Sequence, residues 1–327
     1  MSSRPTIRSR RLTAAGSVTG AEQGAAGSSG GSHPLTDHYV EPIVNLATGG
    51  AALTAPALPD RSEVPDPGAG YAFDNHGPHA QEQHRCLASA YDGITTARLA
   101  ATGVTAGWHC LEIGAGGGSI ASWLAERTAP GGRVLATDLK PELIPSRPGL
   151  EVLRHDIVHD PLPEAGFDLV HARLVLTHIP EREAVLRRLW SALRPGGWLQ
   201  LEEFDVEYAP VLLAPDRRAR EAYQLFQTAK ARALRAAGAE PAWGRSCAEA
   251  MRAAGFVEVD PVPQLVPWDA GSPGLQLQLH HTDHLREALF AQGMTADQLD
   301  EARAVMRHPG FRAASCVLYS VQGRKPE

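Results

Sequence analysis

The sequence predicts an α/β fold in which a doubly wound, mainly parallel sheet of seven strands has helices on both faces. The first observation is that short apolar runs alternate with longer amphipathic stretches between residues 105 and 205, as in repeated βαβ units. The second is that turn-forming glycines separate these stretches at 114–118, 130–132 and 195–197. With 327 residues, 43% of them hydrophobic, the chain can form one large domain with additional elements.

Seven short apolar segments are expected to be the strands. The first five are bounded by turns and short enough to be buried parallel strands. The last two come after a long helical stretch, and the sixth contains prolines. In chain order these segments are 108–113, 133–137, 150–153, 167–170, 198–201, 257–266 and 314–322.

Helical spacing of apolar residues accounts for most of the remaining chain. Residues 78–90 read as one helix, and Asp92 is placed to cap a second helix that runs through Leu99. A further helix follows the glycine cluster from Ile120. Others are expected at 181–193, which 195–197 should end, and at 215–237, 246–254 and 275–308.

The first part of the chain differs in composition from the rest. Residues 1–35 are rich in Gly, Ala, Ser and Thr, so they cannot bury enough apolar surface to offset the entropy of ordering. We therefore expect residues 1–65 to be a largely disordered extension, with a small apolar island at 37–46 that could dock as a lid. The folded domain is expected at 66–327.

Charge and composition limit the classes of partner. The net charge is −6 and the pI about 6.2, and no nucleic-acid-binding motif is present, so we expect a small-molecule partner and no nucleic acid. No apolar run approaches the ~18 residues of a membrane span. The four cysteines are scattered without a CxxC pair, which predicts neither a zinc site nor disulfides and favours the reducing cytoplasm.

Besides the cysteines, the histidines at 280, 281 and 284 are candidate metal ligands. His280 and His284 are four residues apart and would share one face of a helix, but no glutamate follows in a protease-like register. The same spacing suits a solvated helix start capped by Thr282 or Asp283. We therefore expect no metal.

The glycine cluster carries the strongest functional signal. Residues 112–118 read EIGAGGG, between a predicted strand and a predicted helix, where glycines let the backbone turn sharply and approach a ligand. A dinucleotide fingerprint has glycines at its first, third and sixth positions, but the sixth position from Gly114 is Ser119. With Glu112 two residues before the first glycine, the segment resembles the first motif of class I S-adenosylmethionine-dependent methyltransferases.

Other segments resemble this family in the same order. Asp138 ends the second strand, and Asp156 follows the third. Residues 193–199, LRPGGWL, resemble the turn before strand five, and 71–75, YAFDN, resemble a segment before the first motif. The resemblance covers about 71–325, most securely 105–205. It is closest to small-molecule methyltransferases of actinobacterial natural-product pathways.

The resemblance implies a Rossmann-like methyltransferase fold with S-adenosylmethionine as cofactor and an antiparallel last strand. Asp138 would accept both ribose hydroxyls, and Asp156 the adenine amino group, with the backbone of Ile157 beside the ring. Glu112 could instead only orient the loop, and Arg173 could reach the methionine carboxylate or form a surface salt bridge. The residues expected at the cofactor are Glu112, Gly114, Ala115, Gly116, Asp138, Leu139, Asp156, Ile157, Arg173, Tyr71 and Asn75.

An acceptor hydroxyl or amine needs a base, for which histidine is suited near neutral pH. His178 is the first candidate, because it follows the fourth strand at the edge where ligands bind in open α/β sheets; it could instead cap the next helix. Tyr39 and His38 are second candidates if 37–46 is a lid, and Glu203 is a third. Helical lid elements at 71–103, 206–240 and 275–308 should shape the acceptor pocket.

The acceptor itself is not encoded in a motif. Methylation on carbon, nitrogen or oxygen of a small molecule is expected, with an aromatic or indole-type metabolite of secondary metabolism as one candidate. Two alternatives stay open: a nicotinamide-dependent oxidoreductase, and a non-methylating S-adenosylmethionine-binding protein. The apolar N-terminal segment could also serve a homodimer.

Overall fold

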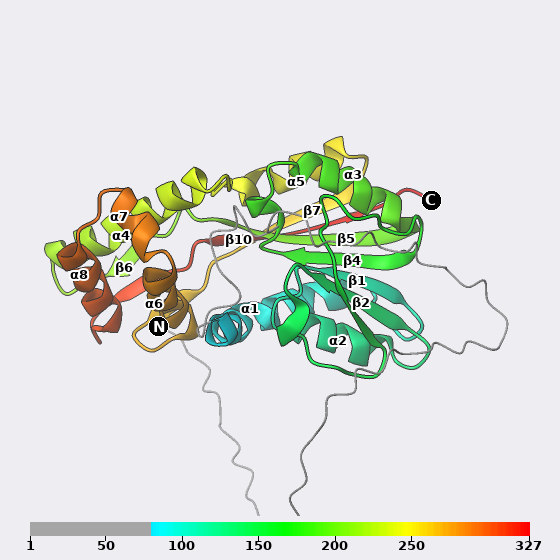
Figure 1. Ribbon diagram of the computed structural model, residues 1–327, viewed down its shortest axis with the longest axis horizontal. Helices are drawn as coiled ribbons and strands as arrows, with labels where there is room; N and C mark the ends of the chain where they lie inside the picture. The colour runs from blue at the N-terminus through cyan, green and yellow to red at the C-terminus, as the bar shows by residue number, and fades with distance from the viewer. Residues whose placement is uncertain (1–79) are drawn as a thin grey trace, which may run out of the picture. The chain divides into compact units, whose positions relative to one another are not determined.

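The computed structural model describes residues 80–327, and its centre is the expected seven-stranded sheet, with order β3-β2-β1-β4-β5-β10-β7 (Figure 1). The first five strands are mutually parallel, and β10 is antiparallel to both of its neighbours. The predicted sheet and its antiparallel last strand are therefore confirmed. The strands are β1 (His109–Ile113), β2 (Arg133–Asp138), β3 (Leu150–Arg154), β4 (Phe167–Arg173), β5 (Leu193–Asp205), β7 (Val257–Gln264) and β10 (Val317–Arg324).

Helices cover both faces of this sheet. The alternation of side chains along β1 explains why: Cys110 packs into one apolar cluster, whereas Leu111 and Ile113 pack into another. The first cluster includes α2 (Ser119–Thr128) and the end of α1 (Ala80–Ala101). The second includes α3 (Arg182–Ala192) and α5 (Cys247–Ala253), on the other side of the sheet in Figure 1.

A buried polar stripe crosses the α1 face of the sheet. The strand register places its members on neighbouring strands, Glu112 beside His171 and His171 beside Gln200. Thr95 of α1 donates a hydrogen bond to Glu202 within the stripe. Such a stripe is tolerated in a core because its members bond to one another. The polar stripe consists of Glu112, His171, Gln200, Glu202, Ser320 and Gln322.

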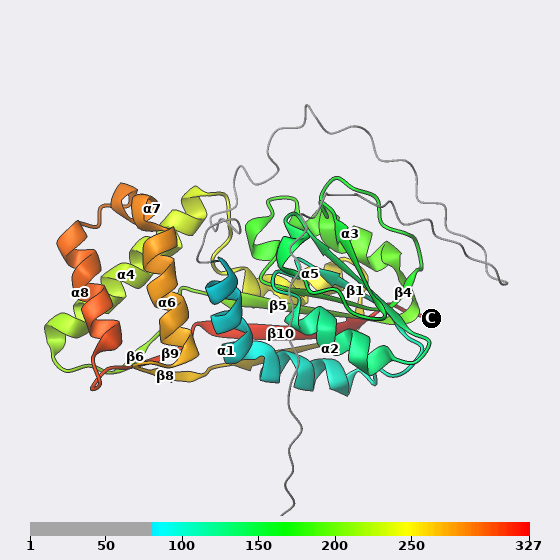
Figure 2. The same ribbon diagram turned by 60° about the horizontal axis from the view of Figure 1, so that its bottom comes forward.

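The remaining helices form a cap around a second, three-stranded sheet with order β6-β9-β8 (Figure 2). Its core includes Tyr223, Phe226 and Phe311, with the rings of Tyr223 and Phe311 5.0 Å apart. The elements of the cap are β6 (Val211–Leu213), α4 (Arg217–Ala236), β8 (Pro267–Asp269), α6 (Pro273–His284), α7 (Arg286–Ala291), α8 (Ala296–Arg307) and β9 (Arg312–Ala314).

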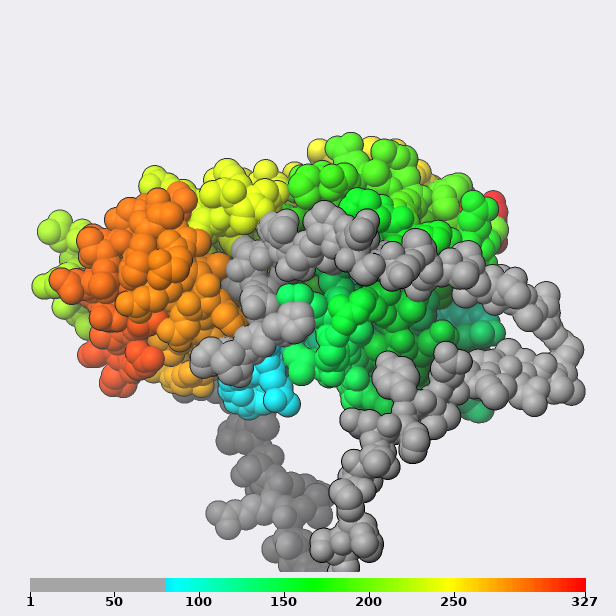
Figure 3. All heavy atoms as spheres, in the orientation of Figure 1, coloured from blue at the N-terminus to red at the C-terminus, as the bar shows by residue number. Residues whose placement is uncertain are grey.

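Helix α1 connects the cap to the central sheet. Its Tyr91 is buried in the core of the cap, and its Leu99 is buried in the core beside α2. In the space-filling view, α1 (cyan) lies beside α6 (orange), in agreement with the contacts between the two helices (Figure 3). Between these two positions, the buried Thr95 bonds to Glu202 of the central sheet.

Three local expectations were wrong. Asp92 does not begin a new helix, because it lies inside α1 and pairs with Arg173. Residues 195–197 do not separate a helix from a strand, because β5 already begins at Leu193. The 280–284 segment ends α6 rather than starting a helix: Ser272 is the N-cap, and Thr282 is fully buried.

Some expectations concern residues outside the described part. These are the extension 1–65, its apolar segment 37–46, and the segment 71–75. Within residues 80–327, no helix combines the length and apolar character needed to cross a membrane.

Candidate active site

A cavity of about 1060 Å³ opens at the carboxyl ends of the parallel strands. It lies where the chain leaves β1 and β4 in opposite directions, the position at which open α/β sheets bind ligands. Helices α1, α4 and α6 supply further lining residues. The sequence-predicted residues that lie on its wall are Glu112, Gly114, Ala115, Gly116, Asp138, Leu139, Asp156, Ile157, Arg173 and His178.

The glycine loop forms the floor of the cavity at the end of β1. Gly114 and Gly116 have φ angles of 62° and 55°, in the left-handed region that favours glycine. A Cβ atom on Gly114 would lie 2.4 Å from Val175, and one on Gly116 would lie 2.8 Å from the His84 ring. The backbone conformation therefore favours glycine at both positions, and a larger residue would displace Val175 or the His84 side chain.

Asp138, the last residue of β2, holds this loop in place. One carboxylate oxygen accepts a hydrogen bond from the Gly116 N–H at 2.9 Å, and the other accepts one from the Lys140 N–H at 2.9 Å. A carboxylate offers about four acceptor positions, so two remain for ligand hydroxyls. The geometry is compatible with the predicted ribose contact, which stays a prediction.

Asp156 follows β3 at another side of the cavity, and Ile157 lies next to it on the wall. The Asp156 carboxylate accepts from the Val158 N–H at 2.9 Å and bonds to the His159 ring at 2.8 Å. Burial opposes its charge, but these hydrogen bonds lower the pKa of Asp156 below its ordinary value. Asp156 is thus held as a carboxylate beside the apolar Ile157, which suits a flat ring with an amino group.

Glu112 faces the buried polar stripe as well as the cavity. Its carboxylate bonds to Nδ1 of His171 at 2.7 Å, and Glu202 approaches the other ring nitrogen at 3.8 Å. Burial disfavours the imidazolium, but the two carboxylates outweigh burial and raise the pKa of His171 to about 9. Glu112 is therefore part of a charged network beneath the glycine loop.

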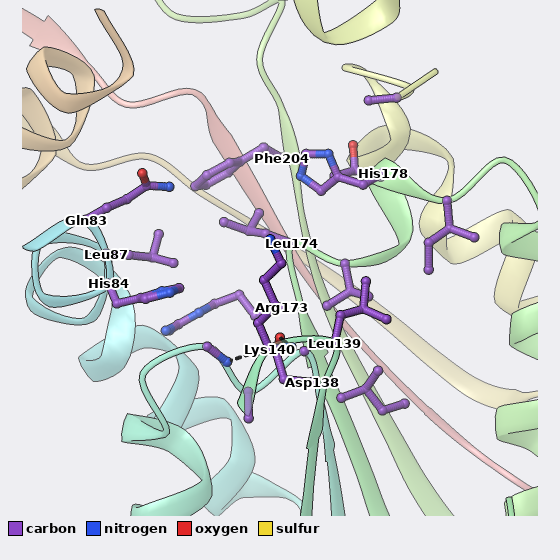
Figure 4. Close-up of a pocket in the computed structure, with 18 of the residues that line it drawn as sticks. Gln83, His84, Leu87, Asp138, Leu139, Lys140, Arg173, Leu174, His178 and Phe204 are labelled. Atoms are coloured by element: carbon purple, nitrogen blue, oxygen red, sulfur yellow. Dashed lines mark hydrogen bonds between the residues drawn. The ribbon is translucent and has the colours of Figure 1, made fainter. Parts of the chain in front are cut away.

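Arg173 forms an ion pair, which was one of the two roles expected for it. The Arg173 side chain in this pair is largely buried, however, and does not lie on the surface. Its guanidinium lies 2.9 Å from Asp92 and donates to Thr95 at 2.8 Å, both on α1. The side chain is 9% exposed. Figure 4 shows Arg173 on the cavity wall, with His84 and Leu87 of α1 pointing toward it. Arg173 thus joins β4 to α1 at the edge of the site.

His178 ends the 3₁₀ helix η2 (Leu176–His178) and lies on the cavity wall beyond β4 (Figure 4). Burial, together with the charge of Arg182, lowers its pKa to about 4. The imidazole is therefore neutral at physiological pH. Leu174 before it has φ 59°, a strained value for a leucine, so the turn out of β4 is held in an uncommon conformation.

Glu203 shapes this turn instead of lining the cavity. Its carboxylate is fully buried and accepts hydrogen bonds from the Val175 and Leu176 N–H groups at 3.2 and 2.8 Å. Burial raises its pKa to about 8, although these backbone bonds act in the opposite direction. The idea that Glu203 is a base at the acceptor is not supported, and we interpret it as a positioning residue for His178.

Several lining residues were missed by the sequence reasoning. His84 of α1 lies over the glycine loop, and Phe204 at the end of β5 points into the cavity (Figure 4). Burial lowers the pKa of His84. The part of the cavity toward the cap, called the acceptor chamber below, is lined by Phe204, Val206, Lys230, Leu277, Gln278 and His281. No local spacing marks these six residues, because they come from three separate segments, the end of β5, α4 and α6.

The other predicted catalytic and binding residues, Tyr39, His38, Tyr71 and Asn75, lie outside the described residues. Within the described part, one group could offer ligand atoms to a metal: Glu82, Cys86 and His280, with these atoms within 4.8 Å of one another. Glu82 is already paired with Arg85, and burial raises the pKa of the Cys86 thiol. These features disfavour a metal there.

The sheet topology and the cavity together define a class of protein. A glycine loop after β1, a carboxylate ending β2 and another after β3 meet at one edge of a seven-stranded sheet with an antiparallel β10. This is the arrangement of class I S-adenosylmethionine-dependent methyltransferases, as the motifs predicted.

Comparison with known proteins agrees. Residues 111–199 match the family described as "Methyltransferase domain". Methyltransferase str2 of Strobilurus tenacellus is 35% identical over 140 residues, 42% of this chain and 48% of str2. Methyltransferase GfsG of Streptomyces halstedii is 31% identical over 136 residues, 37% of this chain and 46% of GfsG.

A third relative is UbiE of Cupriavidus taiwanensis, a ubiquinone/menaquinone biosynthesis C-methyltransferase. It is 29% identical over 128 residues, 36% of this chain and 52% of UbiE. The matched segments thus span about half the length of each relative. Residues 111–199 thus match a methyltransferase domain, and the fold around them is that of class I methyltransferases, whose cofactor is S-adenosylmethionine.

Proposed function

We propose that this chain transfers the methyl group of S-adenosylmethionine to a small-molecule acceptor. The observation that carries the proposal is the junction of the glycine loop with Asp138 at the cavity wall, where a Cβ at Gly114 or Gly116 would collide with Val175 or His84. The cavity of about 1060 Å³ slightly exceeds the usual range for ligand sites, ~300–1,000 Å³, so it has room for a cofactor and an acceptor together.

When bound, S-adenosylmethionine supplies a methyl group on a sulfonium sulfur, which a nucleophile displaces in line. The residues of this chain would hold the two reactants in that alignment, and positioning of this kind lowers the barrier. We assign Gly114, Gly116 and Asp138 to one end of the cofactor, and Asp156 with Ile157 to its adenine ring. Phe204 and Leu174 would exclude water from the reacting atoms.

His178 would receive the proton of a hydroxyl or amine acceptor. Its neutral imidazole lies on the cavity wall, and Glu203 holds the backbone before it. A carbon acceptor needs less help from a base, so His178 would then orient the acceptor or take the proton after transfer. Tyr39 and His38 remain proposed alternatives.

We further propose an aromatic acceptor, of which an indole-type secondary metabolite is one candidate. Support comes from the flat, apolar surface that Phe204 contributes to the acceptor chamber and from the relative named as a C-methyltransferase. A panel of phenols, anilines and indoles, incubated with enzyme and S-adenosylmethionine and analysed by mass spectrometry, would identify the acceptor atom. A homodimer and the absence of a nucleic-acid partner both stay predictions. Light scattering tests the homodimer.

The first experiment is calorimetric binding of S-adenosylmethionine, S-adenosylhomocysteine and NADH. Wild type should bind the first two, and Asp138→Ala should bind them at least about tenfold more weakly because the loop loses its anchor. Asp168→Ala is the matched control: this carboxylate also accepts a backbone N–H, that of His109 at 2.7 Å, but does not line the cavity. Binding of NADH alone would refute the proposal and favour an oxidoreductase.

A further inference from the structure

Lys230 of α4 is a buried cation in the wall of the acceptor chamber. It is 3% exposed, and lysine is rarely buried to this extent without a paired carboxylate. Its Nζ donates to Oε1 of Gln278 at 2.5 Å, and the ammonium lies 5.5 Å from the centre of the Phe226 ring. Among the described residues, no carboxylate forms an ion pair with it. Since an ammonium has three N–H donors, Gln278 leaves donor capacity for a ligand.

The position of this ammonium is fixed by its neighbours. Gln278 is itself 3% exposed, and its Oε1 also accepts from Nε2 of Gln227 at 3.2 Å. The amide oxygen is therefore held between two donors on α4. The ammonium contacts Gln278, and Gln227 in turn holds the Gln278 amide in place. Such a supporting arrangement around a charged group is typical of a binding site.

The two ends of the cavity differ in charge. The end nearest the strands carries charges of both signs, the carboxylates of Glu112, Asp138 and Asp156 and the cations of Lys140 and Arg173. The chamber end carries Lys230 and His281 instead. Burial, and after it the charge of Lys230, lowers the pKa of His281 well below its ordinary value. Burial lowers the pKa of Lys230 itself to about 8, so the amine is still mainly protonated at neutral pH.

A ligand can supply the missing negative charge. We propose that the acceptor is an organic acid with an apolar, ring-sized body, and that its carboxylate binds the Lys230 ammonium, which Gln278 orients. The apolar body would lie against Phe204, Val206 and Leu277, and this places the reacting atom toward His178. The inference rests on the proposed function, because it names the acceptor class of the same site.

The test measures binding of matched acid and amide probes to enzyme saturated with S-adenosylhomocysteine. The probes are benzoate, 3-phenylpropionate and indole-3-acetate, each compared by calorimetry with its primary amide. At least one acid should bind wild type about tenfold or more tightly than its amide. Lys230→Met, which keeps an unbranched side chain without the charge, should lose that difference, and its amide affinity should not change.

Lys325→Met is the control for loss of one positive charge, since Lys325 does not line the cavity and its Nζ donates to the Leu193 carbonyl. It should bind the acids as wild type does. Equal binding of acids and amides by wild type, no binding of any acid, or unchanged acid binding by Lys230→Met would each overturn the inference. Failure of S-adenosylhomocysteine to bind wild type would instead refute the proposed function.

A second measurement does not depend on the probes. If Lys230 serves to bind a ligand, its buried charge has no compensating anion in the ligand-free protein and does not stabilise the fold. The Lys230→Met variant should therefore melt at the same temperature as wild type or higher. A structural lysine would give the opposite result. A clear fall in the melting temperature of the ligand-free variant would therefore overturn the inference.

Discussion

The two ends of the cavity are built in different ways. At the strand end, the cavity-lining groups include backbone atoms and carboxylates placed by consecutive turns after β1, β2 and β3. At the cap end, they are side chains such as Lys230 and Gln278, which come from helices far apart in the sequence. The first end depends on backbone conformation, whereas the second depends on which side chains the cap presents.

On the proposed function, this difference would let one domain keep its cofactor and change its acceptor. A substitution in the glycine loop alters the path of the main chain, so few residues are tolerated there. A substitution at Phe204 or Lys230 alters only the shape or charge of the chamber. We therefore expect cofactor affinity and cap structure to be separable by mutation.

The largest effect is expected from emptying the core of the cap. Phe311 is fully buried against Tyr223, so Phe311→Ala should lower the free energy of unfolding by about 3–5 kcal/mol. S-adenosylhomocysteine should still bind the folded variant with nearly unchanged affinity. Urea unfolding and calorimetry measure the two quantities.

Leu212→Ala is a control on the surface of the same cap, because Leu212 is 53% exposed, and its cost should stay below about 0.5 kcal/mol. If Phe311→Ala instead weakened cofactor binding as strongly as it weakened folding, the two ends could not be treated as separate.

The next effect concerns the glycine loop. Gly116→Ala adds a Cβ at φ 55° and only 2.8 Å from His84, so it should reduce affinity for S-adenosylmethionine by about 100-fold. Gly103→Ala is matched for backbone strain, with φ 85°, but its Cβ meets open space. Both should lose about 1–2 kcal/mol of folding stability, and only the first should lose binding. Equal cofactor affinity in the two variants would show that the loop is not the cradle.

A smaller effect is expected from pH. The Glu112 and Glu202 carboxylates raise the pKa of His171 from 6.5 to about 9, so the folded protein keeps a proton that the unfolded chain releases. The resulting stabilisation is complete below pH 6.5 and is lost as the pH rises toward 9.

Urea unfolding at a series of pH values should show this decline in wild type and a flatter profile in His171→Gln. His159→Gln, which alters an exposed histidine on the loop after β3, should keep the wild-type slope. A wild-type slope in His171→Gln would mean that another group causes the decline.

The sequence was informative where the structure depends on neighbouring residues. The motif at 112–118 and the acids at 138 and 156 lie directly after strands, so their meeting at one edge followed from the parallel sheet alone. His84, Lys230 and Phe204 could not be placed in the same way, because the cap folds back over the sheet through contacts between distant segments. The expected helix break at Asp92 was wrong for a related reason: its partner, Arg173, is 81 residues away.

Helix α1 has a consequence for the energetics of the whole domain. Over 22 residues, or about 33 Å, it places His84 at the glycine loop, Tyr91 in the core of the cap and Thr95 against the polar stripe. A ligand that binds against its first turns stabilises a helix that both layers share. Saturating ligand should therefore protect the amide hydrogens of cap and sheet from exchange together, as one cooperative unit.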